Sequence, residues 1–269
     1  MGRLDAALAD LRALDELAAR DNPLTRIDPR AKLVAVLAFV VVVVSYERHA
    51  VAALLPLAVF PLVLAVLGEV PAGPLLRKLA VAAPFAVMVG LFNPWLERTP
   101  VVVFGSLTLA AGWWSFASIL LRFALTVGTA LVLVASTGMV PLCAALARLG
   151  VPRIFTVQLL LLYRYAFVLG AEAARLATAR RLRSAGRRPA LNSYGPLLGQ
   201  LLLRAFQRAQ RIHEAMGARG FDGELRSLRT LRWQPRDTVF VVGWSSAFVV
   251  LRAVDLPQWL GGTLLACCR

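Results

Sequence analysis

Long apolar runs separated by short polar segments dominate this chain. Five of these runs approach or reach the length of a membrane span, and they lie at roughly 31–46, 50–68, 79–96, 113–136 and 238–254. An α-helix crosses the hydrocarbon core of a bilayer with about 20 apolar residues. The pattern therefore predicts an all-α, polytopic membrane protein with about five transmembrane helices.

Local signals refine the segments around these runs. Residues 4–19 carry leucines at helical spacing among Asp and Arg, which predicts a short amphipathic helix in the membrane interface. Asp28 before Pro29 suits a helix N-cap with proline at the first helical position. Residues 97–112 are expected to form a loop with a short hairpin around Gly105.

The segment from Arg148 to Arg236 is unusually basic. It holds 17 Arg and four acidic residues, a balance of +13 within a whole-chain charge of +15. Arginines alternate with apolar stretches at helical spacing, so we expect two or three long amphipathic helices, broken near 150–152 and near 188–189. The predicted organisation is an interfacial segment, four spans, a coupling-helix region and a last span with the C-terminus. Their ranges are 1–30, 31–136, 137–237 and 238–269.

Composition and charge narrow the functional class. The chain is 59% hydrophobic and only 17% charged, which excludes a disordered chain and a small disulfide scaffold and disfavours a soluble enzyme. Positive residues precede the first and third spans and fill the segment between the fourth and fifth. The positive-inside rule therefore places the N-terminus and residues 137–237 in the cytoplasm.

The chain lacks the residues of an ATPase. A phosphate-binding loop needs Gly-Lys-Ser/Thr, but Lys32 follows Ala31 and Lys78 follows Arg77, and the chain has no other lysine. We therefore expect no cofactor in this chain, and if ATP drives its work another chain hydrolyses it. With two histidines, and three cysteines that we interpret as reduced thiols, no His-rich metal site is expected.

Two similar motifs stand in the basic segment. Residues 179–186 and 215–223 each place a small residue after an arginine at the predicted end of an apolar-faced helix. A small residue lets a helix end approach another backbone closely, and an arginine fork can bind a carboxylate or a carbonyl. Gly220 can also serve as a left-handed C-cap. The alternative is a row of arginines that faces solvent or lipid headgroups.

Five motifs in order resemble the transmembrane coupling subunit (T component) of energy-coupling-factor ABC importers. They are Asp28–Lys32 before the first span, Asn93–Trp95, Tyr163–Tyr165, Leu182–Ser184 and Ala218–Gly220. The amphipathic leader and the phrase ARGFDG at 218–223 are most similar to the cobalt/nickel branch.

The resemblance implies a division of labour. Two cytoplasmic ABC ATPase subunits would bind ATP with Mg²⁺, a separate membrane subunit would bind the substrate, and this non-catalytic chain would join them in the inner membrane of a bacterial or archaeal cell. Arg183 would enter a groove on one ATPase and Arg219 a groove on the other. Ser184 and Gly220 would permit the close approach, with Leu182 and Ala218 completing the motifs. The stretch 179–181 is a rival alignment for the first motif.

Several interpretations stay open at this stage. Interface roles are conceivable for Tyr163, Arg164, Tyr165, Arg208 and Asp222. Arg122, inside the fourth run, either pairs with a backbone carbonyl or has a gating role. Glu172 with Arg175 has the spacing of a helix-supporting ion pair. Competing functions are a T component for a vitamin or other micronutrient, a self-sufficient secondary transporter, and a membrane-anchored nucleic-acid-binding protein. The spans hold no central acid for a coupling ion, and the basic segment lacks interleaved aromatics, so no nucleic-acid partner is expected.

Overall fold

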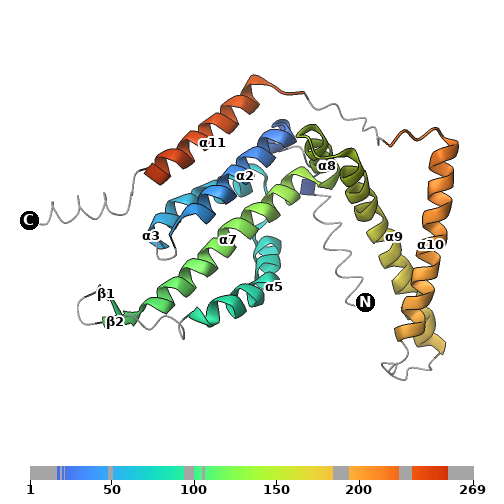
Figure 1. Ribbon diagram of the computed structural model, residues 1–269, viewed down its shortest axis with the longest axis horizontal. Helices are drawn as coiled ribbons and strands as arrows, with labels where there is room; N and C mark the ends of the chain where they lie inside the picture. The colour runs from blue at the N-terminus through green and yellow to red at the C-terminus, as the bar shows by residue number, and fades with distance from the viewer. Residues whose placement is uncertain are drawn as a thin grey trace, which may run out of the picture. The chain divides into compact units, whose positions relative to one another are not determined.

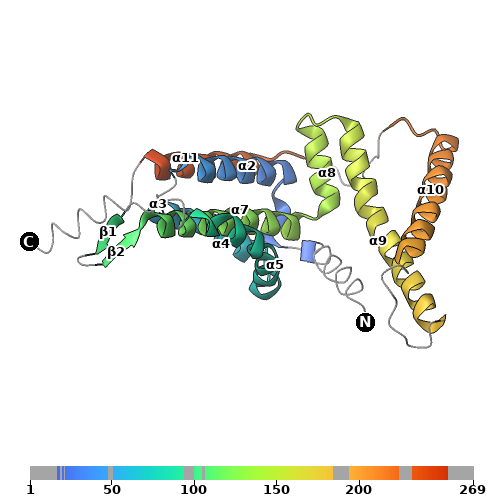
Figure 2. The ribbon, with the colours of Figure 1, turned by 60° about the horizontal axis from the view of Figure 1, so that its bottom comes forward.

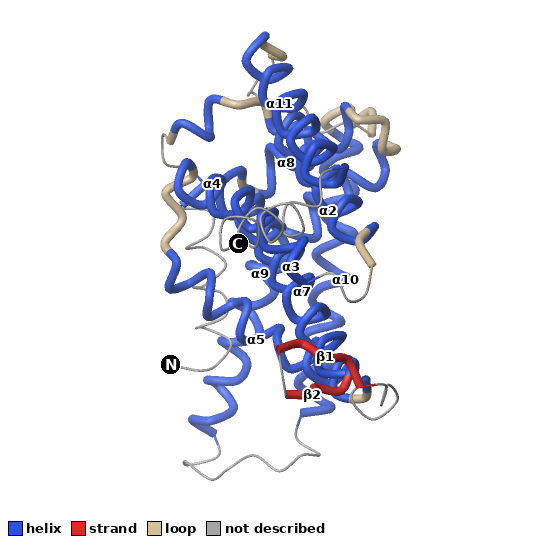
Figure 3. Tube along the Cα trace, turned by 90° about the vertical axis from the view of Figure 1, so that its left-hand side faces the viewer, coloured by secondary structure: helices blue, strands red, loops and turns tan. Residues whose placement is uncertain are grey.

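The computed structural model describes residues 17–18, 20, 22–47, 51–93, 100–104, 107–183, 194–223 and 232–253. Most of the predicted interfacial helix at 4–19 lies outside these residues. The described chain is helical apart from one two-stranded hairpin, which Figure 3 shows in red, so the all-α class is confirmed. The chain divides into two compact units, one formed by residues 17–138 with 231–269 and the other containing residues 139–230.

The first unit contains the helices expected from all five apolar runs. Its elements are η1 (Pro23–Arg26), α2 (Pro29–Ser45), α3 (Val51–Leu54), η2 (Leu55–Ala58), α4 (Val59–Leu67), α5 (Ala72–Leu91), β1 (Pro100–Phe104), β2 (Leu107–Ala110), α7 (Ala111–Thr137) and α11 (Pro235–Ala253). The predicted hairpin is confirmed, since β1 and β2 pair antiparallel with Val101 opposite Leu109.

Helices α2 and α11 lie side by side and run in the same direction (Figures 1 and 2). Between α2, α11 and η2–α4 lies an aromatic core of Phe39, Phe60, Trp244 and Phe248, in which the rings of Phe39 and Phe60 are 4.9 Å apart and those of Phe60 and Phe248 are 5.0 Å apart. Such large buried side chains contribute most of the apolar burial. The last helix is therefore held by helices that precede it by about 200 residues.

Helix α7 runs antiparallel to α2 and also carries α5 on its surface. Gly90 near the end of α5 allows this contact, because a Cβ atom there would stand 2.7 Å from the ring of Phe116. The described residues leave most of α5 otherwise uncovered, and Val81, Phe85 and Met88 are exposed. An apolar helix that lacks protein cover is expected where lipid or another membrane protein covers it.

Three helices are long and apolar enough to cross a membrane: α5, residues Gly112–Thr137 of α7, and Arg153–Arg183. With the apolar α3–α4 stretch they identify a polytopic membrane protein. Helix α2 coincides with a predicted span but has only 17 residues, and α11 carries Arg236, Asp237 and Arg252 near its ends. The charge of residues 153–183 predicts a cytoplasmic segment, yet their length and composition also suit a span.

The second unit consists of α8 (Met139–Arg148), α9 (Arg153–Arg183) and α10 (Tyr194–Ala218). The predicted break near 150–152 is confirmed: Gly150 has a φ of 98°, and the amide of Val151 donates to the carbonyl of Leu146. The predicted break at 188–189 lies outside the described residues. Helices α9 and α10 pack antiparallel as a pair, and no residue of α10 is buried (Figures 1 and 2).

Candidate functional site

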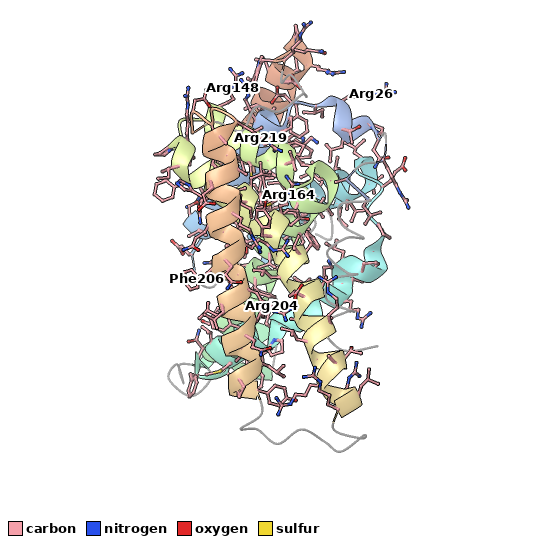
Figure 4. The ribbon with its side chains drawn as sticks, turned by 90° about the vertical axis from the view of Figure 1, so that its right-hand side faces the viewer. Arg26, Arg148, Arg164, Arg204, Phe206 and Arg219 are labelled. Atoms are coloured by element: carbon pink, nitrogen blue, oxygen red, sulfur yellow. The ribbon has the colours of Figure 1, made fainter. Side chains whose placement is uncertain are left out.

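The α9–α10 pair is joined by a three-residue ionic contact. Glu172 on α9 accepts hydrogen bonds from Arg204 on α10 and, at 2.8 Å, from Arg175 one turn away. Figure 4 shows Arg204 beside α9. The predicted Glu172–Arg175 pair is confirmed, but its helix-support role is too narrow, because the same carboxylate also holds the second helix. Helical spacing could not reveal this contact, because Glu172 and Arg204 lie 32 residues apart on two different helices.

The end of α10 is shaped by glycine. Gly220 has a φ of 72°, its amide donates to the carbonyl of Gly217 at 3.0 Å, and the amide of Phe221 donates to that of Met216 at 3.0 Å. These bonds form a Schellman C-cap, so the predicted role of Gly220 is confirmed. A side chain at this φ would be strained. Ala218 is the last helical residue, and Arg219 follows it with its side chain exposed.

The first motif also ends a helix. Arg183 is the last residue of α9 and is exposed, as is Leu182, whose exposed fraction is 78%. Ser184 lies outside the described residues, so its proximity role stays a prediction. In the rival alignment, Arg181 donates a hydrogen bond to the hydroxyl of Thr178, on its own helix, at 3.0 Å. Both alignments place an arginine on the last turn of α9.

Because α9 and α10 are antiparallel, the two motifs lie at opposite ends of the pair. Arg183 is the last residue of α9, whose end lies beside the start of α10, and Arg219 follows the end of α10 (Figure 4). The 25 residues of α10 separate the two ends by about 37 Å at 1.5 Å per residue. The unit thus presents two exposed arginine-bearing ends, one at each end of the α9–α10 pair.

The other predicted interface residues lie between these ends. Tyr163 packs edge-on against Phe167 at 5.1 Å, and the guanidinium of Arg164 lies 6.0 Å from the centre of the Tyr165 ring. All four are in the first two-thirds of α9. Arg208 is partly covered, one turn after Arg204 on α10, and Asp222 is exposed two residues after Gly220. None of these side chains is brought to the end of α9 that carries Arg183.

In the first unit, the contacts of Arg122 match the simpler of its two interpretations, which is pairing with backbone carbonyls. Its guanidinium donates to the backbone carbonyls of Tyr46, at 3.0 Å, and Glu47. Arg252 lies 4.7 Å over the Tyr46 ring and donates to the carbonyl of Ser45 at 3.4 Å. Both cations therefore stabilise the negative C-terminal end of α2. Pairing of Arg122 with backbone carbonyls is confirmed, and a gating role stays untested.

Groups that hold metals or perform catalysis are sparse in the described residues. No group of three or more His, Cys, Asp and Glu side chains occurs among them. His213 is exposed on α10. Cys143 on α8 is a buried free cysteine, and burial raises the pKa of its thiol, which keeps it protonated and unreactive.

Comparison with known proteins decides the family. Residues 20–230 match the family described as cobalt transport protein, CbiQ. The chain belongs to the CbiQ family. This match covers α2 to α10 and both arginine motifs, so the resemblance to a T component is confirmed at the level of the family. Members of this family are membrane components of transport systems.

Individual relatives match over shorter stretches. The cobalt transport protein CbiQ of Rhodobacter capsulatus is 37% identical over 113 residues, 41% of this chain and 45% of that protein. The energy-coupling factor transporter transmembrane protein EcfT of Staphylococcus aureus is 45% identical over 51 residues, 18% of this chain and 19% of that protein. The matched stretches thus span less than half the length of each of these relatives.

The ionic contact between α9 and α10 gives a direct test of the pair. Arg204→Glu is expected to separate the helices, because it sets two carboxylates face to face, and Glu172→Arg in the same chain is expected to restore the pair. Spin labels at the exposed positions 178 and 200 measure the distance between the helices. Arg175→Gln serves as the control, because it removes only the bond within α9. An unchanged distance in Arg204→Glu contradicts the contact.

Proposed function

We propose that this chain is the transmembrane coupling subunit of an energy-coupling-factor importer for cobalt ions. It transmits the conformational change of two cytoplasmic ABC ATPases to a separate membrane subunit that binds the substrate. ATP and Mg²⁺ are bound by the ATPases, and the chain itself catalyses no reaction. The family and the name of the Rhodobacter capsulatus relative support cobalt as the substrate.

One observation carries the coupling role: two exposed arginines stand at opposite ends of one antiparallel helix pair. Two ends with the same chemistry suit two copies of one receptor, and a separation of about 37 Å, given by the 25 residues of α10, is of the order of a small domain's diameter. Adjacent ATPase subunits, each with one groove, supply such a pair of receptors. An arginine bound to carboxylates or carbonyls in a groove is held by several hydrogen bonds.

The proposed orientation places the α9–α10 pair along the cytoplasmic surface of the cell's inner membrane. Arginine enrichment between α8 and α11 supports this side through the positive-inside rule. Helix α10 presents Leu198, Leu202 and Phe206 as one exposed apolar row, which Figure 4 marks at Phe206. This row faces the bilayer and the substrate-binding subunit in our proposal, while the arginine-bearing ends face the ATPases.

Uptake of labelled ions tests the function. Cells without their own cobalt importers, given the ATPase, the substrate-binding subunit and this chain, are expected to accumulate ⁵⁷Co²⁺. Omission of this chain is expected to reduce accumulation to background, because hydrolysis is then uncoupled from transport. Radioactive nickel and vitamins distinguish the other substrates. Uptake by this chain alone, abolished by a protonophore, indicates a secondary transporter and contradicts the proposal.

A further inference from the structure

A buried polar cluster lies at one end of the first unit, where α2 and α11 begin and α7 ends. Its central members are Asp28, Lys32, Thr137 and Asp237, with exposed fractions of 5%, 2%, 5% and 1%. Each comes from the first or last turn of a helix or from the residue that caps it. Neither the proposed ATPase contacts nor the apolar spans account for buried charges at this place.

Asp237 ties the start of α11 to the start of α2. One carboxylate oxygen accepts the amide of Gln234 at 2.8 Å, which caps its own helix, and the other accepts the amide of Asp28 at 2.9 Å. Asp28 in turn caps α2 by accepting the amide of Arg30 at 2.9 Å. Two helix starts 209 residues apart in the sequence therefore share one chain of charge-assisted hydrogen bonds.

Lys32 ties the same turn of α2 to the end of α7. It stands one turn after Asp28, and its ammonium nitrogen lies 3.5 Å from the hydroxyl oxygen of Thr137. That distance is at the outer limit of a hydrogen bond, but the donor is a charged group withdrawn from water. Thr137 is the last residue of α7, and Gly138 follows with a φ of 78°.

These two contacts lie near both boundaries of residues 139–230. The first unit ends at Gly138, directly after Thr137, and resumes at Leu231, six residues before Asp237. We propose that the Asp28–Lys32 turn is a positioning anchor: it holds the end of α7 and the start of α11 against the start of α2. A displacement that reaches either α7 or α11 from the coupling helices then acts on α2, α7 and α11 together. This inference rests on the proposed coupling function.

The electrostatics favour a positioning role over a stabilising one. Asp28, Arg30, Lys32 and Asp237 give two negative and two positive charges, so the cluster is compensated. Replacing a compensated buried cluster with apolar side chains of similar size is often neutral for stability, so in our proposal this cluster is retained for the geometry that it imposes. A separate buried contact precedes the cluster in the sequence: the side-chain amide of Asn22 donates to the carbonyl of Gly68, at the end of α4, at 2.7 Å.

The test uses the complete complex in proteoliposomes and compares ⁵⁷Co²⁺ uptake per ATP hydrolysed. Lys32→Met and Asp237→Asn are expected to retain the ATPases and to hydrolyse ATP within about twofold of the unmodified complex. Their uptake per ATP is expected to fall about tenfold or more. Lys78→Met is the matched control, because Lys78 is the chain's second and last lysine and lies on α5. It is expected to behave as the unmodified complex.

A milder pair keeps the test decisive if the charge variants fail to assemble. Thr137→Val removes the hydroxyl at nearly constant volume, and Thr137→Ser retains it. Uptake per ATP about threefold lower in Thr137→Val than in Thr137→Ser supports the anchor. Unchanged uptake per ATP in Lys32→Met and Asp237→Asn, or in Thr137→Val where those two do not assemble, overturns it. An unmodified complex that retains no ATPase or imports no Co²⁺ refutes the proposed function instead.

Discussion

Charge reversal at both helix ends, in the variant Arg183→Glu/Arg219→Glu, is expected to abolish retention of the ATPases while the protein stays in the membrane. Arg183 is exposed on the last turn of α9 and Arg219 is exposed directly after α10, so neither substitution disturbs the packing of α9 against α10. Removal of one partner from a buried, hydrogen-bonded charge pair costs about 2–5 kcal/mol. Each single variant should thus weaken binding by at least about 30-fold.

The measurement is co-purification of the ATPases with the affinity-tagged, full-length chain from solubilised membranes. Arg211→Glu is the matched control, because it makes the same charge change at an exposed position two turns before the end of α10. It should retain the ATPases. Retention by the double variant equal to that of Arg211→Glu would show that the helix ends are not the docking points. A double variant lost from the membrane fraction would show instead a role in folding.

Local sequence signals predicted three helix boundaries, whereas the third apolar run, expected at 79–96, became α5 at Ala72–Leu91. The Asp28-Pro29 start of α2, the left-handed Gly220 after α10 and the break at Gly150 all follow from backbone preferences of one or two residues. Such preferences act within a single turn, so one sequence suffices to find them. The five apolar runs likewise became helices, because their length and composition depend on no distant partner.

Contacts between distant segments could not be predicted in this way. The Arg204–Glu172 contact needs the antiparallel packing of α9 and α10, and the Asp28–Asp237 contact needs α11 to return beside α2. Helical spacing places Glu172 near Arg175, but it does not show which residue donates to the second carboxylate oxygen of Glu172. A faint signal existed at Asp237: an acidic residue at the third position of a helix often bonds back to its cap. This signal does not reveal that the carboxylate of Asp237 also accepts the amide of Asp28.

The antiparallel packing of α9 and α10 also limits how these helices can lie in the membrane if both arginine motifs bind ATPases. A helix of 31 residues that is apolar over much of its length suits a span, and α9 meets that description. If α9 crossed the bilayer, Arg183 and Arg219 would face opposite sides, and ATPases on one side could bind only one of them. The coupling function therefore demands that α9 and α10 lie along one surface.

Cysteine labelling is expected to place both helix ends on the cytoplasmic side. In a variant with Cys143, Cys267 and Cys268 replaced by serine, Arg183→Cys and Arg219→Cys should each react with a membrane-impermeant maleimide in inside-out vesicles and stay unlabelled in intact cells. The reason is the charge of the segment, which opposes transfer of its arginines across the membrane. We expect labelling at both positions to be complete in inside-out vesicles and absent in intact cells.

Glu47→Cys provides the matched control for this experiment. Residue 47 is exposed and follows the end of α2, whose start bears Arg30 and Lys32, so it should label in intact cells and not in inside-out vesicles. Labelling of positions 183 and 219 from opposite sides would establish α9 as a span and reject two-point docking. Labelling of both from the cytoplasmic side leaves the apolar part of α9 to be covered by lipid or by a membrane partner, because the described chain covers only a small part of it.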